Sequence, residues 1–168
     1  MAYASHFKHA DDIVHHLNTV VPVLTDPLLQ AKYVGFVAVA SITVYELAVK
    51  DIFIEFSAKK NRVFGSFTES YFRRINGRIR IKTIKDDYVK RFGDKYLQRF
   101  ERRLTKEKNT YLRQHRRDIV SSYSNLIVWR NDFAHSGVFS TSATYGEVVQ
   151  SYEDGKEVIH CLAGVMNR

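Results

Sequence analysis

The 168-residue chain has few residues that cross-link or break a fold: it contains 1 Cys, 2 Pro and 8 Gly. The single cysteine, Cys161, has no partner for an internal disulfide, so we expect a reducing, cytoplasmic environment. So few prolines and glycines argue against a β-sandwich, which needs a turn about every ten residues. The first residues lack the basic region, apolar core and small-residue cleavage site of a secretory signal, and none is predicted.

Apolar residues, in contrast, are abundant. Hydrophobic residues make up 45% of the chain and aromatic residues 13%, which excludes intrinsic disorder and low-complexity classes. The length fits one domain, and the sequence contains no linker long enough to divide it. We therefore expect a single domain spanning residues 1–168.

The net charge of +8 is concentrated in one segment. Residues 59–117 hold 20 Lys and Arg against 6 Asp and Glu, whereas the rest of the chain holds 6 against 12. Cations at this density repel one another, and a polyanion such as RNA would relieve the repulsion. We interpret residues 59–117 as a basic elaboration within the domain. Its residues predicted to bind RNA are Arg73, Arg74, Arg78, Arg80, Lys90, Arg91, Arg102, Arg103, Arg113, Arg116 and Arg117.

Residues 27–58 are predicted to form a long central helix. Asp26-Pro27 combines a capping side chain with proline in the first turn. Between Tyr33 and Val49 the only charged residue is Glu46, and a carboxylate in such a segment is costly unless it is paired. Glu46 is therefore a candidate neighbour of a functional site, or it reaches the surface or meets an arginine. The polar residues and short length argue against a membrane span, and a strand is the weaker alternative.

The remaining pattern is also helical. His6 and His9 lie one turn apart, but no cysteine or close carboxylate pair completes a ligand set, and we expect no metal site. A capping box opens the last helix, and Asp154-Gly155 is expected to break or kink it. The other predicted segments are helices at 3–24, 66–74, 86–108 and 110–135, a turn at Asn76-Gly77 and a short extended stretch at 78–82.

The second long helix, at 110–135, carries an arginine on its buried side. Its apolar seam advances in steps of four and three through Ile119, Tyr123, Leu126, position 130 and Phe133. Desolvating the guanidinium of Arg130 costs several kcal/mol unless something meets it. Either Glu46 or another acid pairs with Arg130, or Arg130 lines a groove that binds an anion.

His135 follows Arg130 by five residues. Five helical steps turn the chain by roughly 500°, which leaves the two side chains about 140° from alignment. They converge only if the helix end unwinds or if a second copy of the chain supplies the other half. Gly137, after Ser136, is predicted to end the helix.

The run from Arg130 to Gly137 reads Arg-Asn-Asp-Phe-Ala-His-Ser-Gly. It resembles the R-x4-6-H motif of the HEPN superfamily, and the Arg-Asn…Ala-His form followed by Ser-Gly is most similar to RiboL-PSP-type HEPN domains. The motif lies near the end of a late long helix, with one more helix after it, which agrees with the resemblance. The resemblance implies an all-α fold built as an antiparallel four-helix bundle. It does not cover the basic residues 59–117, which we expect to form an extra helical insertion in that bundle.

The resemblance also implies a metal-independent endoribonuclease that acts as a homodimer, with Arg130, His135 and Asn131 at its site and no cofactor. RNA supplies its own nucleophile, the 2′-hydroxyl, so the protein must add a proton shuttle and a cation. Histidine changes its charge near neutral pH and suits the shuttle, whereas arginine suits the charge of a pentavalent phosphorane. Asn131 would orient the histidine or the phosphate.

The chain departs from one pattern of the superfamily. In HEPN toxins silenced by adenylylation the motif continues His-x-Tyr, whereas Gly137 stands at that position here. We therefore expect a toxin or phage-defence nuclease controlled by another antitoxin or regulatory protein. Two alternatives are a non-catalytic nucleic-acid-binding regulator and a module that binds an acidic protein. In those cases Arg130 bridges to Glu46 and His135 merely ends the helix.

Overall fold

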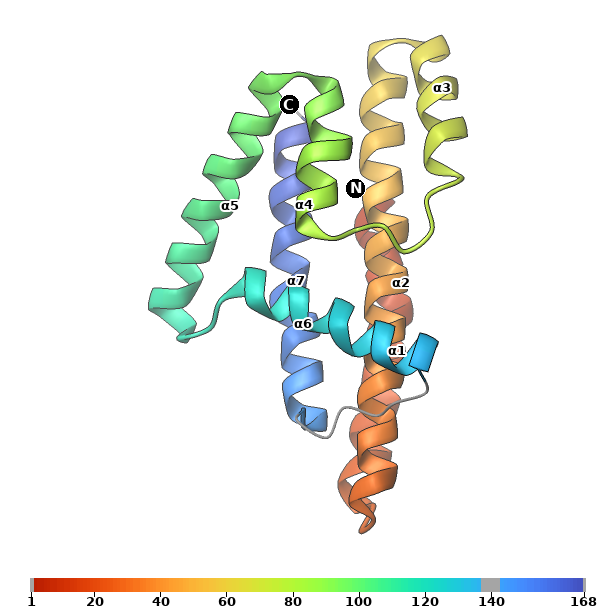
Figure 1. The fold of residues 1–168 in the computed structure, drawn as a ribbon, viewed down its shortest axis with the longest axis vertical. Coiled ribbons are helices and arrows are strands. Elements are labelled where there is room, and N and C mark those ends of the chain that lie inside the picture. The colour runs from red at the N-terminus through yellow and green to blue at the C-terminus, as the bar shows by residue number, and fades with distance from the viewer. Residues whose placement is uncertain (1, 137–142, 168) are drawn as a thin grey trace.

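The computed structural model describes residues 2–136 and 143–167, and every regular element in these ranges is a helix (Figure 1). The elements are η1 (Ala2–His6), α1 (Phe7–Val20), η2 (Val21–Val23), α2 (Pro27–Lys60), α3 (Arg62–Phe72), α4 (Ile81–Thr83), η3 (Ile84–Tyr88), η4 (Val89–Phe92), α5 (Asp94–His115), α6 (Ile119–Asn131), η5 (Asp132–Ser136) and α7 (Tyr145–Met166). The all-α prediction is confirmed, and the strand alternative for residues 27–58 is wrong. The short extended stretch predicted at 78–82 is limited to residues before Ile81, where α4 begins. Within these ranges no helix has the length and apolar character of a membrane span.

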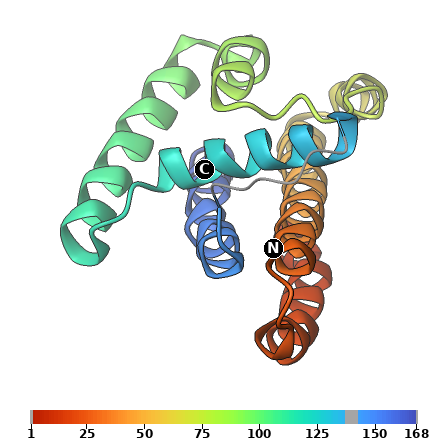
Figure 2. The ribbon, with the colours of Figure 1, turned by 60° about the horizontal axis from the view of Figure 1, so that its bottom comes forward.

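The long helix α2 forms the axis of the bundle. Its neighbours α1 and α3 run antiparallel to it, α7 lies beside it, and α6 crosses both α2 and α7 (Figures 1 and 2). The basic segment forms α3, the short helices and α5, which pack around the upper part of α2 and the far side of α7. Asp26 accepts a hydrogen bond from the Leu28 amide, which confirms the predicted helix start.

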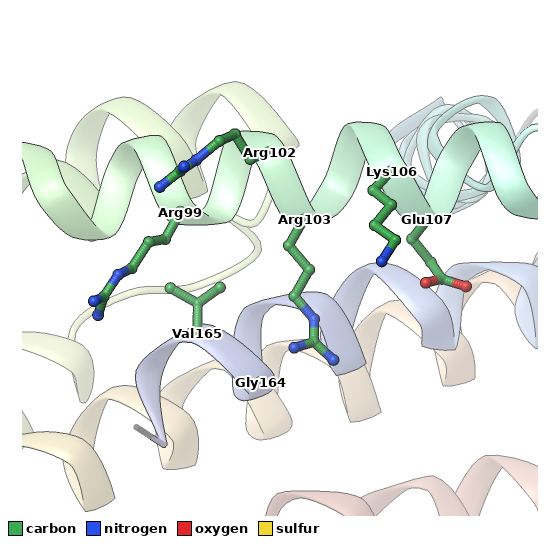
Figure 3. Close-up of a pocket in the computed structure, with 7 residues that line it drawn as sticks. All are labelled: Arg99, Arg102, Arg103, Lys106, Glu107, Gly164 and Val165. Carbon is green, nitrogen blue, oxygen red and sulfur yellow. The ribbon is translucent and has the colours of Figure 1, made fainter.

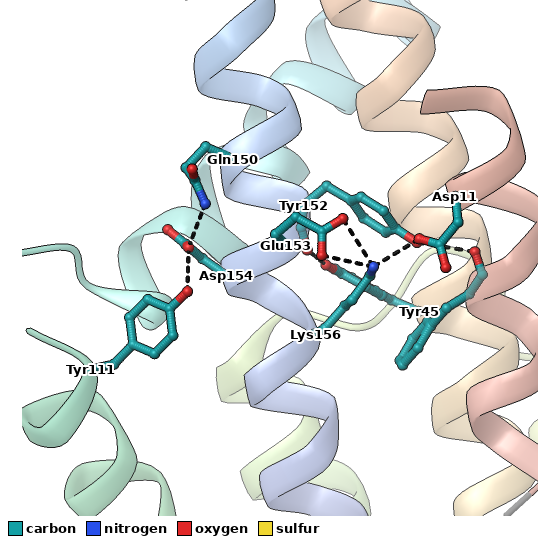
Figure 4. A network of polar contacts seen from close by, with 9 residues as sticks. Asp11, Tyr45, Tyr111, Gln150, Tyr152, Glu153, Asp154 and Lys156 are labelled. Carbon is teal, nitrogen blue, oxygen red and sulfur yellow. Dashed lines mark hydrogen bonds and ion pairs between the residues drawn. The ribbon is translucent and has the colours of Figure 1, made fainter. Parts of the chain in front are cut away.

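Three stacked tyrosines fill the crossing of α2, α6 and α7. The ring of Tyr45 lies 5.5 Å from that of Tyr123 and 5.9 Å from that of Tyr152, and all three side chains are buried. The Tyr45 hydroxyl donates to the Tyr152 carbonyl, and the Tyr152 hydroxyl donates to Asp11 on α1 (Figure 4). Burial raises the pKa of Tyr45 well above its ordinary value, so its phenol stays neutral and keeps donating.

A buried carboxylate ties α5, α6 and α7 together. Asp154 is fully buried, and its oxygens accept hydrogen bonds from Tyr111 at 2.8 Å and Gln150 at 3.1 Å (Figure 4). Ser122 donates to it at 2.9 Å, and Arg117 forms an ion pair with it at 3.1 Å. The sequence predicts a break here, but α7 continues through Asp154 and Gly155. A side chain at Gly155 would lie 2.7 Å from the Tyr45 hydroxyl, so the glycine serves close packing rather than a kink.

Two helix boundaries differ from the sequence prediction. The predicted helix 86–108 is interrupted at Gly93, whose φ of +112° ends η4 before α5 begins. The predicted helix 110–135 is interrupted at Arg116, whose φ of +58° ends α5, and Asp118 then caps α6 through the Val120 amide. Arginine rarely adopts a left-handed conformation, which is why nothing in the residue pattern marked this break.

The end of the chain agrees better with prediction. Thr144 and Glu147 form the expected capping box at the start of α7. Cys161 is buried, and burial raises the pKa of its thiol to about 11, so it packs as a small apolar residue. The helix predicted at 66–74 lies at Arg62–Phe72 instead, because Asn61 caps it. Gly137, the predicted helix stop, lies outside the described residues.

Replacing Asp154 by alanine is expected to lower the free energy of unfolding by about 3 kcal/mol, because Arg117 and three neutral donors lose their buried partner. Urea denaturation followed by circular dichroism measures the change. Asp86→Ala is the control, since Asp86 is exposed and the described residues offer it neither an ion pair nor a side-chain hydrogen bond. A loss below about 1 kcal/mol for Asp154→Ala would show that the network contributes little to stability.

Candidate functional site

The Arg-Asn…Ala-His run lies where α6 ends against α2. The helix changes form inside the run: α6 stops at Asn131, and η5 continues as a π-helix from Asp132 to Ser136. Hydrogen bonds in a π-helix join residues five apart rather than four apart, so each turn holds more residues. The wider turn brings His135 closer to the face that carries Arg130 than a regular α-helix would.

The Arg130 side chain is half-buried and has no acidic partner among the described residues. Its Nη1 donates to Asn131 Oδ1 at 2.9 Å. Among the described residues no carboxylate forms an ion pair with Arg130, so the predicted alternative of a bridge to Glu46 is wrong. Asn131 was expected to orient the histidine or the phosphate, and its side chain instead meets the guanidinium. A positive charge that is half-withdrawn from water with no counter-ion is suited to receive an anionic ligand.

Gly77 forms one wall of the guanidinium site. Its φ is +68°, and a side-chain carbon there would lie 2.7 Å from Arg130 Nη2. A residue with a side chain would both strain the backbone and displace the arginine. The sequence marks Asn76-Gly77 only as a turn, because nothing local links a turn to a guanidinium 53 positions away.

Glu46 positions this wall. Its Oε2 accepts the Gly77 amide hydrogen bond, and its Oε1 forms an ion pair with Lys50 at 2.7 Å. The carboxylate therefore reaches the site through the backbone of Gly77, with its charge compensated by a lysine one turn along α2. The prediction that Glu46 neighbours the site agrees with this geometry, although its direct partner differs from the one proposed.

Two buried phenols fix the loop that carries Gly77. Tyr88 donates to the Arg78 carbonyl at 2.7 Å, and Tyr123 donates to the Ile79 carbonyl at 2.8 Å. Burial raises the pKa of Tyr88 to about 12, so the donor persists at physiological pH. The loop between α3 and α4 is thus held at three successive residues, one by Glu46 and two by tyrosines.

Phe133 anchors the other side of the run. Its ring packs directly on Gly35 of α2, where an added side-chain carbon would lie 2.2 Å from the ring. The ring of Phe36 lies 5.3 Å from that of Phe133, and Phe36 is 54% exposed. Phe133 is therefore a packing residue, and the exposed ring of Phe36 lies against it.

His135 is exposed at the end of this arrangement. Within the described ranges its imidazole has neither a hydrogen-bond partner nor an ion-pair partner. An exposed imidazole without a partner among the described residues is available for proton transfer to a ligand.

The predicted RNA-binding cations divide into engaged and open groups. Arg117 is held by buried Asp154, and Arg73 pairs with Glu69 at 2.6 Å, so both have structural partners and their contact with RNA stays a prediction. Arg91 lies over the Tyr71 ring at 5.1 Å but remains exposed. The others are exposed and form no ion pair with any described carboxylate: Arg74, Arg78, Arg80, Lys90, Arg102, Arg103, Arg113 and Arg116.

One basic cavity borders α6 itself. Arg80 and Lys82 line a cavity of about 350 Å³ together with Ser124, Ile127 and Val128. Arg80 follows Gly77 by three residues, so this cavity continues the loop that touches Arg130. Lys82, which the residue pattern did not single out, thus lies with Arg80 at a cavity beside α6.

No metal-binding group of three or more His, Cys, Asp or Glu side chains occurs in the described part of the chain. His6 contacts Asp51 at 2.6 Å rather than His9.

Comparison with known protein families gives one result. The family described as RiboL-PSP-HEPN matches residues 5–168, which is nearly the whole chain. Neither the curated proteins nor the solved structures give a significant match.

Gly77→Ala is expected to shift the Arg130 Nε–Hε signal in a ¹H–¹⁵N spectrum, because the added carbon displaces the guanidinium. The positive φ should also lower stability by about 1–2 kcal/mol. Gly93→Ala is the matched control: it adds the same carbon at a positive φ, but nothing lies within 4 Å. An unchanged Arg130 signal in Gly77→Ala would contradict the wall assigned to Gly77.

Proposed function

Because the chain belongs to the RiboL-PSP-HEPN family, whose members are commonly ribonucleases, we propose that it is an endoribonuclease whose site contains Arg130 and His135. The observation that carries the proposal is the half-buried Arg130 guanidinium without a described carboxylate partner, in one helical run with the exposed imidazole of His135. A structural arginine in this position would be expected to have an acidic partner. An arginine that binds a phosphate, in contrast, needs a guanidinium that no carboxylate already neutralises.

The proposed reaction uses the RNA as its own nucleophile and needs no metal or cofactor. The 2′-oxygen attacks the adjacent phosphorus, the bond from phosphorus to the 5′-oxygen breaks, and the products are a 2′,3′-cyclic phosphate and a 5′-hydroxyl. The planar guanidinium of Arg130 donates to the phosphoryl oxygens as negative charge accumulates on them. Asn131 and Gly77 hold the guanidinium in place before the RNA arrives.

Proton transfer falls to His135. One imidazole must accept the proton of the 2′-hydroxyl, and another group must donate a proton to the departing 5′-oxygen. A homodimer that places two runs around one cleft would supply two histidines and two arginines. The exposed side chains of Phe36 and Leu29, 54% and 39% exposed on the helix that supports the run, are apolar surface that a second copy could cover.

Such a nuclease would need control in the cell, and we propose a role as a toxin or phage-defence effector restrained by a regulatory protein. Gly137 stands where an adenylylated tyrosine would be required. The regulator would therefore act by binding rather than by that modification.

Arg130→Ala and His135→Ala are each expected to reduce cleavage at least about 100-fold, through loss of charge stabilisation and of proton transfer. Labelled RNA is incubated with purified protein in EDTA, and the ends are analysed for cyclic phosphate. His16→Ala is the control, because His16 is exposed on α1. Undiminished cleavage by both site variants would refute the assignment, and binding without cleavage by the unmodified protein would favour the non-catalytic regulator.

A mixing experiment tests whether two chains build the site. If each site takes Arg130 from one chain and His135 from the other, an equal mixture of the two inactive alanine variants regains about a quarter of the unmodified activity, because half of the dimers hold one intact site. The variants are unfolded and refolded together, with separately refolded samples as controls. No recovery, in a mixture shown by native mass spectrometry to contain heterodimers, would place both side chains in one chain.

A further inference from the structure

A basic groove separates α5 from the end of α7. We name it the α5–α7 groove; its volume is about 490 Å³, and it is lined by Arg99, Arg102, Arg103, Lys106, Glu107, Gly164 and Val165 (Figure 3). The four cations are spaced i, i+3, i+4 and i+7, which places them on one face of α5. Arg99, Arg103 and Lys106 extend from α5 toward α7.

The cations of the groove lack carboxylate partners, unlike others close by in the chain. Lys85 pairs with Glu101, and Lys108 pairs with Asp118. In the described part of the chain no ion pair includes a cation of the α5–α7 groove, and Glu107 is the single acid that lines it. Like charges at i, i+4 destabilise a helix, so this face of α5 is less stable without an anion than with one.

Gly164 makes room for one of these cations. A side-chain carbon at this position would lie 2.4 Å from Arg103 Cζ, so the guanidinium occupies the space that the glycine leaves free. Glycine inside a helix lowers its stability relative to alanine. The pair of Gly164 and Arg103 therefore sets a guanidinium into the wall of the groove instead of leaving it on an extended side chain in solvent.

Phosphate groups match this arrangement. Guanidinium groups bind phosphate oxygens through paired, charge-assisted hydrogen bonds, and three arginines with one lysine exceed what a single phosphate needs. We propose that the α5–α7 groove binds consecutive phosphates of an RNA backbone and holds the strand outside the cleavage site. This inference rests on the proposed function for the choice of RNA as the polyanion. The expectation that the groove binds phosphate rests on the groove residues alone.

The groove and the candidate site occupy different parts of the fold. In both ribbon views α5 lies on one side of α7, whereas the end of α6 that carries Arg130 lies toward α2 on the other side (Figures 1 and 2). The groove cations therefore do not reach the phosphate held by Arg130. These cations should therefore raise the affinity for RNA without touching the scissile phosphate, and they should raise it more for long strands than for short ones.

The first experiment removes charge. His135→Ala serves as the background so that RNA stays intact, and Arg103→Gln/Lys106→Gln is compared with Arg62→Gln/Lys95→Gln, which removes one arginine and one lysine from exposed positions outside the groove. Binding of a labelled 20-nucleotide RNA is measured from 50 to 300 mM salt. The groove variant should bind at least about tenfold more weakly, and its log–log salt slope should fall by about 1.4, the value for two lost contacts to a single strand. Equal losses in both variants would overturn the proposal.

The second experiment changes shape without changing charge. Gly164→Ala should push Arg103 out of the groove wall and weaken RNA binding. Gly146→Ala, in the same helix but with nothing within 4 Å, should leave binding unchanged. If the cations only compensate the negative end of the α7 dipole, the arginine and lysine variants lose thermal stability while their RNA affinity stays the same, which would overturn the proposal.

Competition identifies the source of the phosphate. Inorganic tripolyphosphate and a 5-nucleotide RNA are each titrated against the labelled 20-nucleotide strand. A groove variant that loses tripolyphosphate binding but keeps full RNA affinity would identify a small-polyphosphate site and overturn the backbone assignment. All these readouts are binding constants, so loss of RNA affinity in the groove variant supports the groove even if the cleavage test of Arg130 and His135 fails.

Discussion

The contact between the Arg130 guanidinium and the Gly77 backbone joins the parts of the molecule that matter for its chemistry. Gly77 is held by Glu46 from α2, and its loop is held by the tyrosines of η3 and α6. Arg130 is held by Asn131 and by the packing of Phe133 on α2. The contacts to the guanidinium therefore come from a neutral amide and a glycine, and no described carboxylate forms an ion pair with it.

Most of the fold could be predicted from the sequence, because helix starts depend on local capping residues and central helices are marked by continuous apolar residues. Asp26 and the Thr144–Glu147 pair predicted two helix starts correctly for this reason. The failures lie where tertiary contacts override local preference. Asp154-Gly155 resembles a turn, yet Tyr111, Ser122 and Gln150 satisfy the carboxylate inside a continuous helix. The break at Arg116 requires a left-handed arginine, which no pattern of residue types signals.

The motif in the sequence identified the candidate site residues, whose roles stay a prediction, but no residue pattern indicated what supports them. Arg130 and His135 stood out because of the motif and because an arginine occupied an apolar seam. The role of Gly77 was invisible, because its contact spans two elements that are distant in the chain. The same limit applies to the basic segment. Charge density marked Arg117 and Arg103 equally, and only the folded structure shows that Arg117 pairs with a buried carboxylate whereas Arg103 lies beside Gly164.

The π-helical end of α6 has a consequence for local stability. A regular α-helix aligns side chains four apart, whereas this chain spaces its arginine and imidazole by five and adopts a wider, less favourable turn between them. The regular pattern of backbone hydrogen bonds between residues four apart is therefore lost over the residues proposed to carry the chemistry. Amide hydrogens of η5 should therefore exchange with solvent sooner than those around Tyr123, where the helix is regular and the tyrosine side chain is buried.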